Sequence, residues 1–172
     1  MEAKYHHIFV AASDVDIRTL EVIRRAIDVA ERNDADITIG HVIDSTAYET
    51  AGTFPTELPQ QLRDEFVTQT NPLVKLAKER IGEDRVHVAV KFGRIRETLI
   101  DELIDDVDPD LVVCGTRGLS ALKYALFGSV STYLTRAVKC DVLVVKMRPA
   151  DDDVSREASD TDDAKNESEQ AS

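Results

Sequence analysis

The sequence predicts an α/β fold in which a parallel sheet is covered by helices on both faces. Two patterns alternate along the chain: short runs rich in β-branched residues, and longer stretches with apolar residues at helical spacing. Repeated strand–helix alternation is typical of parallel sheets, because parallel neighbours are joined by crossover connections that are usually helices. With 172 residues, of which 42% are hydrophobic, the chain has the size and apolar content of a single domain.

Five runs are predicted to be strands because each is short and rich in Val and Ile. They are residues 6–12, 35–42, 85–92, 110–115 and 141–146.

Three helices are predicted between and after these strands. The first helix is predicted by apolar residues at helical spacing, and Ser13 or Asp14 can cap its N-terminus. The apolar residues are Ile17, Leu20, Ile23, Ile27 and Ala30. A similar stripe predicts a helix over residues 95–107, which Asp108 and Pro109 end. The last helix is predicted over residues 129–139.

The connection between the second and third strands is less regular. Residues 45–59 are predicted to form an exposed loop, and residues 60–69 a first helical piece. Asn71 followed by Pro72 predicts a kink or a restart, because Asn caps helices and Pro favours their first position.

The charge of the chain is strongly negative and unevenly distributed. The formal net charge is -12, and residues 150–172 hold nine acidic residues against two basic ones, with Val154 as the one branched aliphatic. We therefore expect a domain over residues 1–149 and an acidic disordered tail over residues 150–172. An acidic protein is not expected to bind nucleic acid or anionic membranes. Thirteen Arg and eight Lys among so many acids also fit the hypothesis of a halophile-like protein working in high salt.

The sequence predicts a cytoplasmic protein that is not inserted in a membrane. There is no run of about eighteen apolar residues, and MEAKYHHIFVAAS does not resemble a signal peptide. Cys114 and Cys140 lack metal-like spacing and lie beside predicted strands, so both are expected to pack as small apolar residues.

The stretch CGTRGLSALKYALFGSVS, residues 114–131, holds three of the seven glycines. Gly115 follows a strand, Gly118 allows a positive φ or close approach of a ligand, and Gly128 and Ser129 begin the last helix. Free N–H groups, the helix dipole and the serine hydroxyl together form an anion site, for which phosphate is the expected ligand. Ordinary caps and turns are the structural alternative. Neither GxxxxGK[ST] nor GxGxxG is present.

This stretch matches G-x2-G-x9-G-[ST], and the chain thereby resembles the universal stress protein family. HVID (41–44), FGRIRETLI (92–100) and DVLVVK (141–146) also resemble the family in order and spacing, so that the similarity spans residues 4–147. It implies a Rossmann-like sheet of the adenine nucleotide alpha hydrolase type with strand order 3-2-1-4-5. It also implies a homodimer, or a higher oligomer, formed through residues 141–147, and binding of ATP with or without Mg²⁺.

The resemblance also implies the roles of individual residues. The glycines and Ser129 contact phosphate and ribose, the Val42 backbone recognises adenine, and the end of the first strand lies under the nucleotide. The implied site consists of Ala12, Ser13, Val42, Gly115, Arg117, Gly118, Gly128, Ser129, Val130 and Ser131. Ser13 stands where many ATP-binding members have aspartate. Arg94 also borders this region, but a solvent-facing side chain is the favoured interpretation.

No catalytic group is predicted. His6 and His7 are adjacent in a strand and point to opposite faces, while His41 and His87 are expected to have packing or surface roles. The acidic cluster at residues 105–110 is interpreted as a solvated turn.

Three functions follow in order of preference. The first is a dimeric, ATP-binding stress or regulatory protein with at most slow ATP hydrolysis. The second is a nucleotide-free module of the same fold that acts on a protein partner. The third is an ATP-dependent enzyme, although the SGGxDS loop of such ligases is absent.

Overall fold

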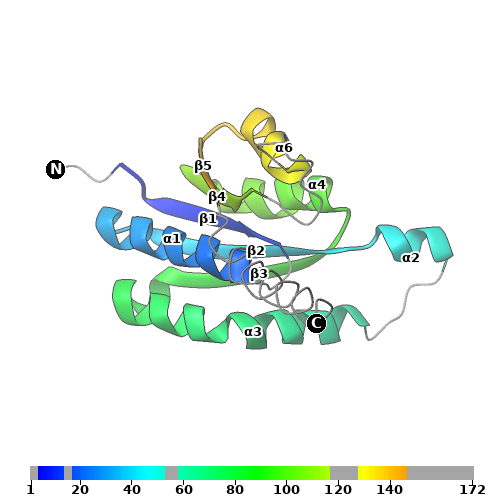
Figure 1. Ribbon diagram of the computed structural model, residues 1–172, viewed down its shortest axis with the longest axis horizontal. Helices are drawn as coiled ribbons and strands as arrows, with labels where there is room; N and C mark the ends of the chain where they lie inside the picture. Colours follow the sequence, from blue (N-terminus) through cyan, green and yellow to red (C-terminus); the bar gives the residue numbers. More distant parts are fainter. Residues whose placement is uncertain (1–3, 14–16, 53–57, 117–127, 147–172) are drawn as a thin grey trace, which may run out of the picture.

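Five parallel strands form one sheet with the order β3-β2-β1-β4-β5 in the computed structural model (Figure 1). The structure describes residues 4–13, 17–52, 58–116 and 128–146. The strands are β1 (His7–Ala12), β2 (Asp36–Asp44), β3 (Val86–Gly93), β4 (Leu111–Gly115) and β5 (Asp141–Val145). The predicted parallel sheet and the strand order implied by the family resemblance are both confirmed.

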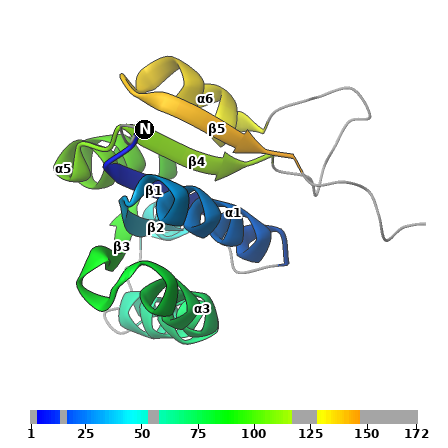
Figure 2. The same cartoon turned by 90° about the vertical axis from the view of Figure 1, so that its left-hand side faces the viewer.

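Helices cover the sheet on both sides, and alternate side chains of each strand enter two different cores. On one face lie α1 (Ile17–Asn33) and α3 (Leu58–Ile81), which pack on Ile8 and Val10 of β1. On the other face lie α6 (Ser129–Ala137) and three consecutive helical segments: α4 (Ile95–Glu97), the π-helical stretch η2 (Thr98–Ile104) and α5 (Asp105–Val107). The two layers are visible on opposite sides of the strands in Figure 1, and Figure 2 shows α6 beside β5. Because successive strand residues point to opposite faces, Phe9 packs in the second core.

The prediction of an irregular loop directly after β2 is wrong for its first part. The short helix α2 (Thr46–Ala51) begins there and ends at Gly52, whose φ of 65° suits a glycine. The carboxylate of Asp44 accepts hydrogen bonds from the backbone N–H and the hydroxyl of Thr46, at 3.0 and 2.6 Å. A helix start held by a side chain in this way was not recognised in the sequence.

The predicted restart at Pro72 is also wrong, because α3 runs uninterrupted from Leu58 to Ile81. Pro72 lacks the N–H that would bond to the carbonyl four residues earlier, and such a loss normally breaks a helix. Here Phe66, Leu73 and Ala77 are all buried against the sheet on either side of the proline. The hydroxyl of buried Thr70 donates to the Phe66 carbonyl at 2.8 Å. Apolar packing along the whole helix therefore offsets the missing hydrogen bond.

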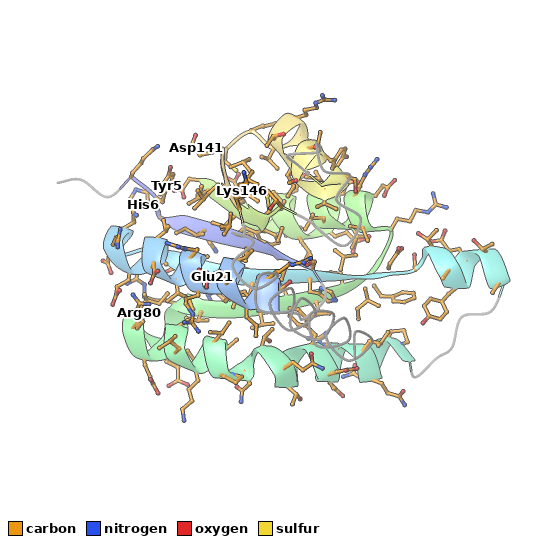
Figure 3. The ribbon with its side chains drawn as sticks, viewed as in Figure 1. Tyr5, His6, Glu21, Arg80, Asp141 and Lys146 are labelled. Atoms are coloured by element: carbon orange, nitrogen blue, oxygen red, sulfur yellow. The ribbon has the colours of Figure 1, made fainter. Side chains whose placement is uncertain are left out.

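Arginine side chains tie the C-terminal end of α3 to α1. Arg80 lies between the two helices (Figure 3), with Nη1 2.8 Å from the Asp28 carboxylate and a second ion pair to Glu31. Hydrogen bonding by Arg80 holds the pKa of the Glu31 carboxyl below its usual range. Such exposed pairs contribute little stability individually, so their role here is to fix how α3 sits against α1.

Aspartates anchor the beginning of β1 at the amino edge of the sheet. Asp110, which directly precedes β4, accepts hydrogen bonds from the backbone N–H groups of His6 and His7 at 2.7 and 3.2 Å. Asp141 accepts one from the Tyr5 hydroxyl at 2.9 Å, and the two side chains lie together in Figure 3. Asp110 thus has a structural role that the interpretation of its cluster as a solvated turn did not include.

Candidate functional site

The strand order places the candidate site at the carboxyl ends of β1 and β4. The chain proceeds from β1 to β2 and β3 in one direction across the sheet, whereas β4 and β5 lie on the other side of β1. Ligands of open parallel sheets bind outside the carboxyl ends of the strands at such a reversal. Ser13, Gly115 and Thr116 come directly after or at these ends.

The first turn of α6 supplies uncapped backbone N–H groups. Gly128 is the N-cap, with φ -74° and ψ 168°, and no side chain of the described residues caps it. The first bond within the helix runs from the Thr132 N–H to the Gly128 carbonyl at 3.0 Å. The N–H groups of Ser129, Val130 and Ser131 therefore have no partner of the usual helical kind. Together with the positive end of the helix dipole, they favour an anion.

The two serines of this turn are placed differently. Ser129 is exposed. Ser131 is buried, and its hydroxyl donates to the Gly128 carbonyl at 3.0 Å. The Ser131 hydroxyl is thus engaged inside the turn, while the Ser129 hydroxyl is accessible.

Gly115 has a packing role that can be read directly from the structure. A Cβ atom on this residue would lie 3.0 Å from Cγ2 of Val22 in α1. The absence of a side chain therefore lets α1 approach the end of β4, which is a known use of glycine in nucleotide-binding α/β folds. This packing role stands beside the ligand contact that the family resemblance implies for Gly115.

The end of β1 is held by side chains from β2 and α1. Ala12 is buried, and its carbonyl accepts a hydrogen bond from Nδ1 of His41 at 3.1 Å. The hydroxyl of exposed Ser13 lies 2.9 Å from the hydroxyl of Thr19. Asp14, the other predicted cap of α1, lies outside the described residues.

Val42 is the first residue of β2 beyond its pairing with β1. The β1–β2 ladder ends at Ala12 and His41, whereas β2 continues to pair with β3 as far as Asp44. The Val42 side chain is buried in the second core, so the part of Val42 that can meet a ligand is its backbone. This placement fits the role that the family resemblance implies for the residue.

The structure describes Arg94, one of the two candidate arginines. Arg117 and Gly118 lie outside the described residues. Arg94 is exposed and donates two hydrogen bonds to Glu49 of α2, from Nε at 3.0 Å and from Nη2 at 2.8 Å. Arg94 and Ser45 hold the pKa of the Glu49 carboxyl below its usual value. Arg94 thus joins α2 to the end of β3.

Cys114 lies just before Gly115 and is a buried, free thiol, as predicted from its strand position. Burial raises the pKa of this thiol from 9.0 to about 11. A thiol this hard to ionise is a poor nucleophile at neutral pH.

The raised pKa of Cys114 predicts a loss of stability at alkaline pH. Between pH 9 and 11 the unfolded chain releases the thiol proton before the native state does, so the free energy of unfolding falls as the pH rises. Over this pH range, the free energy of unfolding of the wild type should fall by about 2 kcal/mol more than that of Cys114→Ala. Denaturant titrations at a series of pH values measure it. Identical pH profiles for the two proteins would contradict the assignment.

A cavity of about 550 Å³ occupies the opposite, amino edge of the sheet. It is lined by residues from the start of β1, the end of η2 and the approach to β5, including Tyr5, Ile104 and Asp141. Because it lies at the other end of the strands from the first turn of α6, it is separate from the candidate site.

These features define a doubly wound α/β protein with a candidate anion site where the N-terminus of α6 meets the carboxyl edge of the sheet. The model of the universal stress protein family matches residues 4–146. The chain therefore belongs to the universal stress protein family.

Two curated relatives carry the same family name. A universal stress protein of Staphylococcus saprophyticus is 35% identical over 132 residues, which cover 75% of this chain and 77% of that protein. One from Staphylococcus haemolyticus is 32% identical over 133 residues, which cover 77% and 80%.

Solved structures share the fold. The universal stress protein UspA from Lactobacillus plantarum superposes with a TM-score of 0.65 at 21% identity, covering 83% of this chain and 99% of that one. A universal stress protein in complex with cAMP gives a TM-score of 0.54 at 25% identity, with 82% and 96% covered. In the described residues of the present chain, no helix is long and apolar enough to cross a membrane.

Proposed function

We propose that this universal stress protein binds ATP at the carboxyl edge of its sheet and acts as a cytoplasmic regulatory switch. The observation that carries the proposal is the first turn of α6, which no side chain of the described residues caps and whose N–H groups follow Gly128 in the family's G-x2-G-x9-G-[ST] pattern. Support comes from the position of this turn beside the topological reversal of the sheet and from the cAMP complex of a structural neighbour. Backbone N–H groups bind phosphate without any catalytic side chain.

Under this proposal, the protein binds ATP far better than it hydrolyses it. The chain has no Walker lysine, and its histidines are placed away from the α6 turn or are used in packing. Ser13 and Ser129 are the candidate hydroxyls for a ligand, with Mg²⁺ entering with the nucleotide. Binding then shifts the protein toward the state that holds the nucleotide better.

Titration of the full chain with ATP tests the proposal directly. Measurements by calorimetry at near-molar and at low KCl should give saturable binding, and the comparison also tests the hypothesis of a halophile-like protein. Competition with cAMP tells whether the site requires a triphosphate. If the folded protein does not bind ATP at either salt concentration, the proposal is wrong.

A nucleotide-free interaction module is the second candidate function. The observation that favours it is the Ser13 hydroxyl, which contacts Thr19 at a position where many ATP-binding members have aspartate. In this case the acidic residues 150–172, which we propose to be a tail separate from the domain over residues 1–149, provide a contact for a protein partner. Saturable ATP binding would count against this candidate.

We also propose that two copies of the chain associate through β5. This strand pairs with β4 on one side and ends the sheet on the other, and Leu143 is 38% exposed. The Val145 carbonyl accepts a hydrogen bond from Thr116, so Val145 directs its backbone toward β4. Because alternate strand residues direct their N–H and C=O groups to opposite sides, Val142 and Val144 direct theirs outward. An unpaired strand edge of this kind is a site for pairing with another strand.

Val144→Pro should make the protein monomeric without unfolding it. Proline is tolerated on an edge strand where the lost N–H faces outward, but it removes a donor that a second copy needs. Light scattering should show half the wild-type mass, with an unchanged circular dichroism spectrum. Leu143→Pro is the matched control: it removes an N–H that bonds to β4 and should destabilise the fold itself. A wild-type protein that is already monomeric would contradict the proposed dimer.

A further inference from the structure

His41 of β2 has a buried polar side chain that lies next to the end of β1, beside the proposed nucleotide site. It is 8% exposed and lies on the face of β2 that carries Ile39 and Ile43 into the core under α3. A buried polar group of this kind is normally hydrogen-bonded, because an unmade hydrogen bond in the interior is unfavourable. The contacts of the ring therefore indicate what the histidine does.

The His41 ring contacts the backbone of β1. Nδ1 of His41 lies 3.1 Å from the carbonyl oxygen of Ala12. A carbonyl can only accept, so Nδ1 carries the proton and donates it. Ala12 and His41 are the last residues paired in the β1–β2 ladder. The histidine side chain thus holds the final carbonyl of β1 at the point where ladder pairing ends.

Phe66 of α3 holds the ring in this orientation. The His41 and Phe66 rings stack with centroids 4.3 Å apart and planes 6° from parallel. Phe66 is 3% exposed and belongs to the same core. Because the ring plane is fixed by stacking, Nδ1 stays directed at the Ala12 carbonyl.

We propose that His41 is a positioning residue of the nucleotide site, an inference that rests on the proposed function. His41 holds the Ala12 carbonyl, and the Ser13 side-chain hydroxyl contacts the Thr19 hydroxyl of α1, so each of the two residues that leave β1 is held by a neighbouring element. Their main chain forms the floor of the proposed site. The His41 ring itself lies on the face of the sheet that packs under α3. Fixing this main chain before ATP arrives removes an ordering cost from binding, which strengthens affinity.

Two substitutions separate the hydrogen bond from the ring. His41→Phe keeps an aromatic ring to stack on Phe66 but has no donor, whereas His41→Asn keeps an N–H near the Nδ1 position but has no ring. We expect ATP to bind about tenfold more weakly to His41→Phe and within about threefold of wild type to His41→Asn. His7→Phe is the matched control, since Nε2 of His7 bonds to Thr38 at 3.0 Å near the amino edge. It should leave the affinity unchanged.

A measurement without ATP accompanies the titrations. The amide resonance of Ser13, which follows the Ala12 carbonyl, should move in His41→Phe and return toward wild type in His41→Asn. Wild-type affinity in His41→Phe, or equal losses in both variants, would overturn the inference. If wild type binds no ATP, the proposed function fails, and the Ser13 resonance alone then decides whether His41 positions this main chain.

Discussion

Gly128→Val should abolish measurable ATP binding while leaving the protein folded. The φ and ψ of Gly128, -74° and 168°, lie in the extended region that valine readily adopts, so the backbone is not strained. The new side chain, however, would be attached at the N-cap of α6, next to the N–H groups that we propose hold phosphate, and we expect it to obstruct the ligand. Because each hydrogen bond to a charged group contributes about 1.5–3 kcal/mol, we expect affinity to fall by about 100-fold or more.

Calorimetric titration of this variant is compared with that of two further variants. Gly128→Ala should give an intermediate loss, since its side chain is smaller, and Ser129→Ala should remove one hydroxyl while keeping the backbone donors. The unfolding midpoint of each ligand-free variant reports on the fold. Wild-type affinity in a folded Gly128→Val protein would show that ATP binds elsewhere.

Gly40→Ala should destabilise the protein by about 3 kcal/mol or more, a large effect for a single methyl group. A Cβ atom on Gly40 would lie 2.1 Å from Cζ and 2.6 Å from Cε2 of Phe9. Phe9 is fully buried in the second core, between the sheet and the helices η2 and α6. The ring cannot move aside without displacing its packed neighbours, because protein interiors have few voids.

A double-mutant cycle isolates this contact. Phe9→Leu removes the ring atoms that would collide with the new methyl group, and on its own it should destabilise the protein by leaving a cavity. In the Gly40→Ala background it should instead recover part of the lost stability. Urea denaturation of the four proteins gives the interaction free energy. Strictly additive effects would show that the ring does not fill the space beside Gly40.

Much of the fold could be predicted from the sequence because two periodicities alternate without ambiguity. Val and Ile runs located all five strands, and the stripe between residues 95 and 107 located the helical layer on the second face. The errors fell between β2 and β3, where local signals compete with packing. Pro72 signals a break, but buried Phe66 and Leu73 on either side keep α3 continuous.

The candidate site was only partly predictable, because some contributions come from residues distant in sequence. The glycine spacing identified Gly128 and Ser129, and the structure places them at the start of α6. No local pattern could show that Gly115 makes room for Val22, or that His41 holds Ala12. Those contacts depend on how β2, β4 and α1 come together in three dimensions.

The position of β1 in the middle of the sheet has a consequence for biosynthesis. Its residue Ile8 pairs with Ile37 on one side and with Leu111 on the other. As the polypeptide leaves the ribosome, β1 therefore acquires its first neighbour early, but its other edge stays open until more than a hundred residues have been translated. Open strand edges and uncovered apolar surface promote aggregation of nascent chains. Chaperone dependence should accordingly be greatest during translation of the segment before β4, and it should end once β4 has paired with β1.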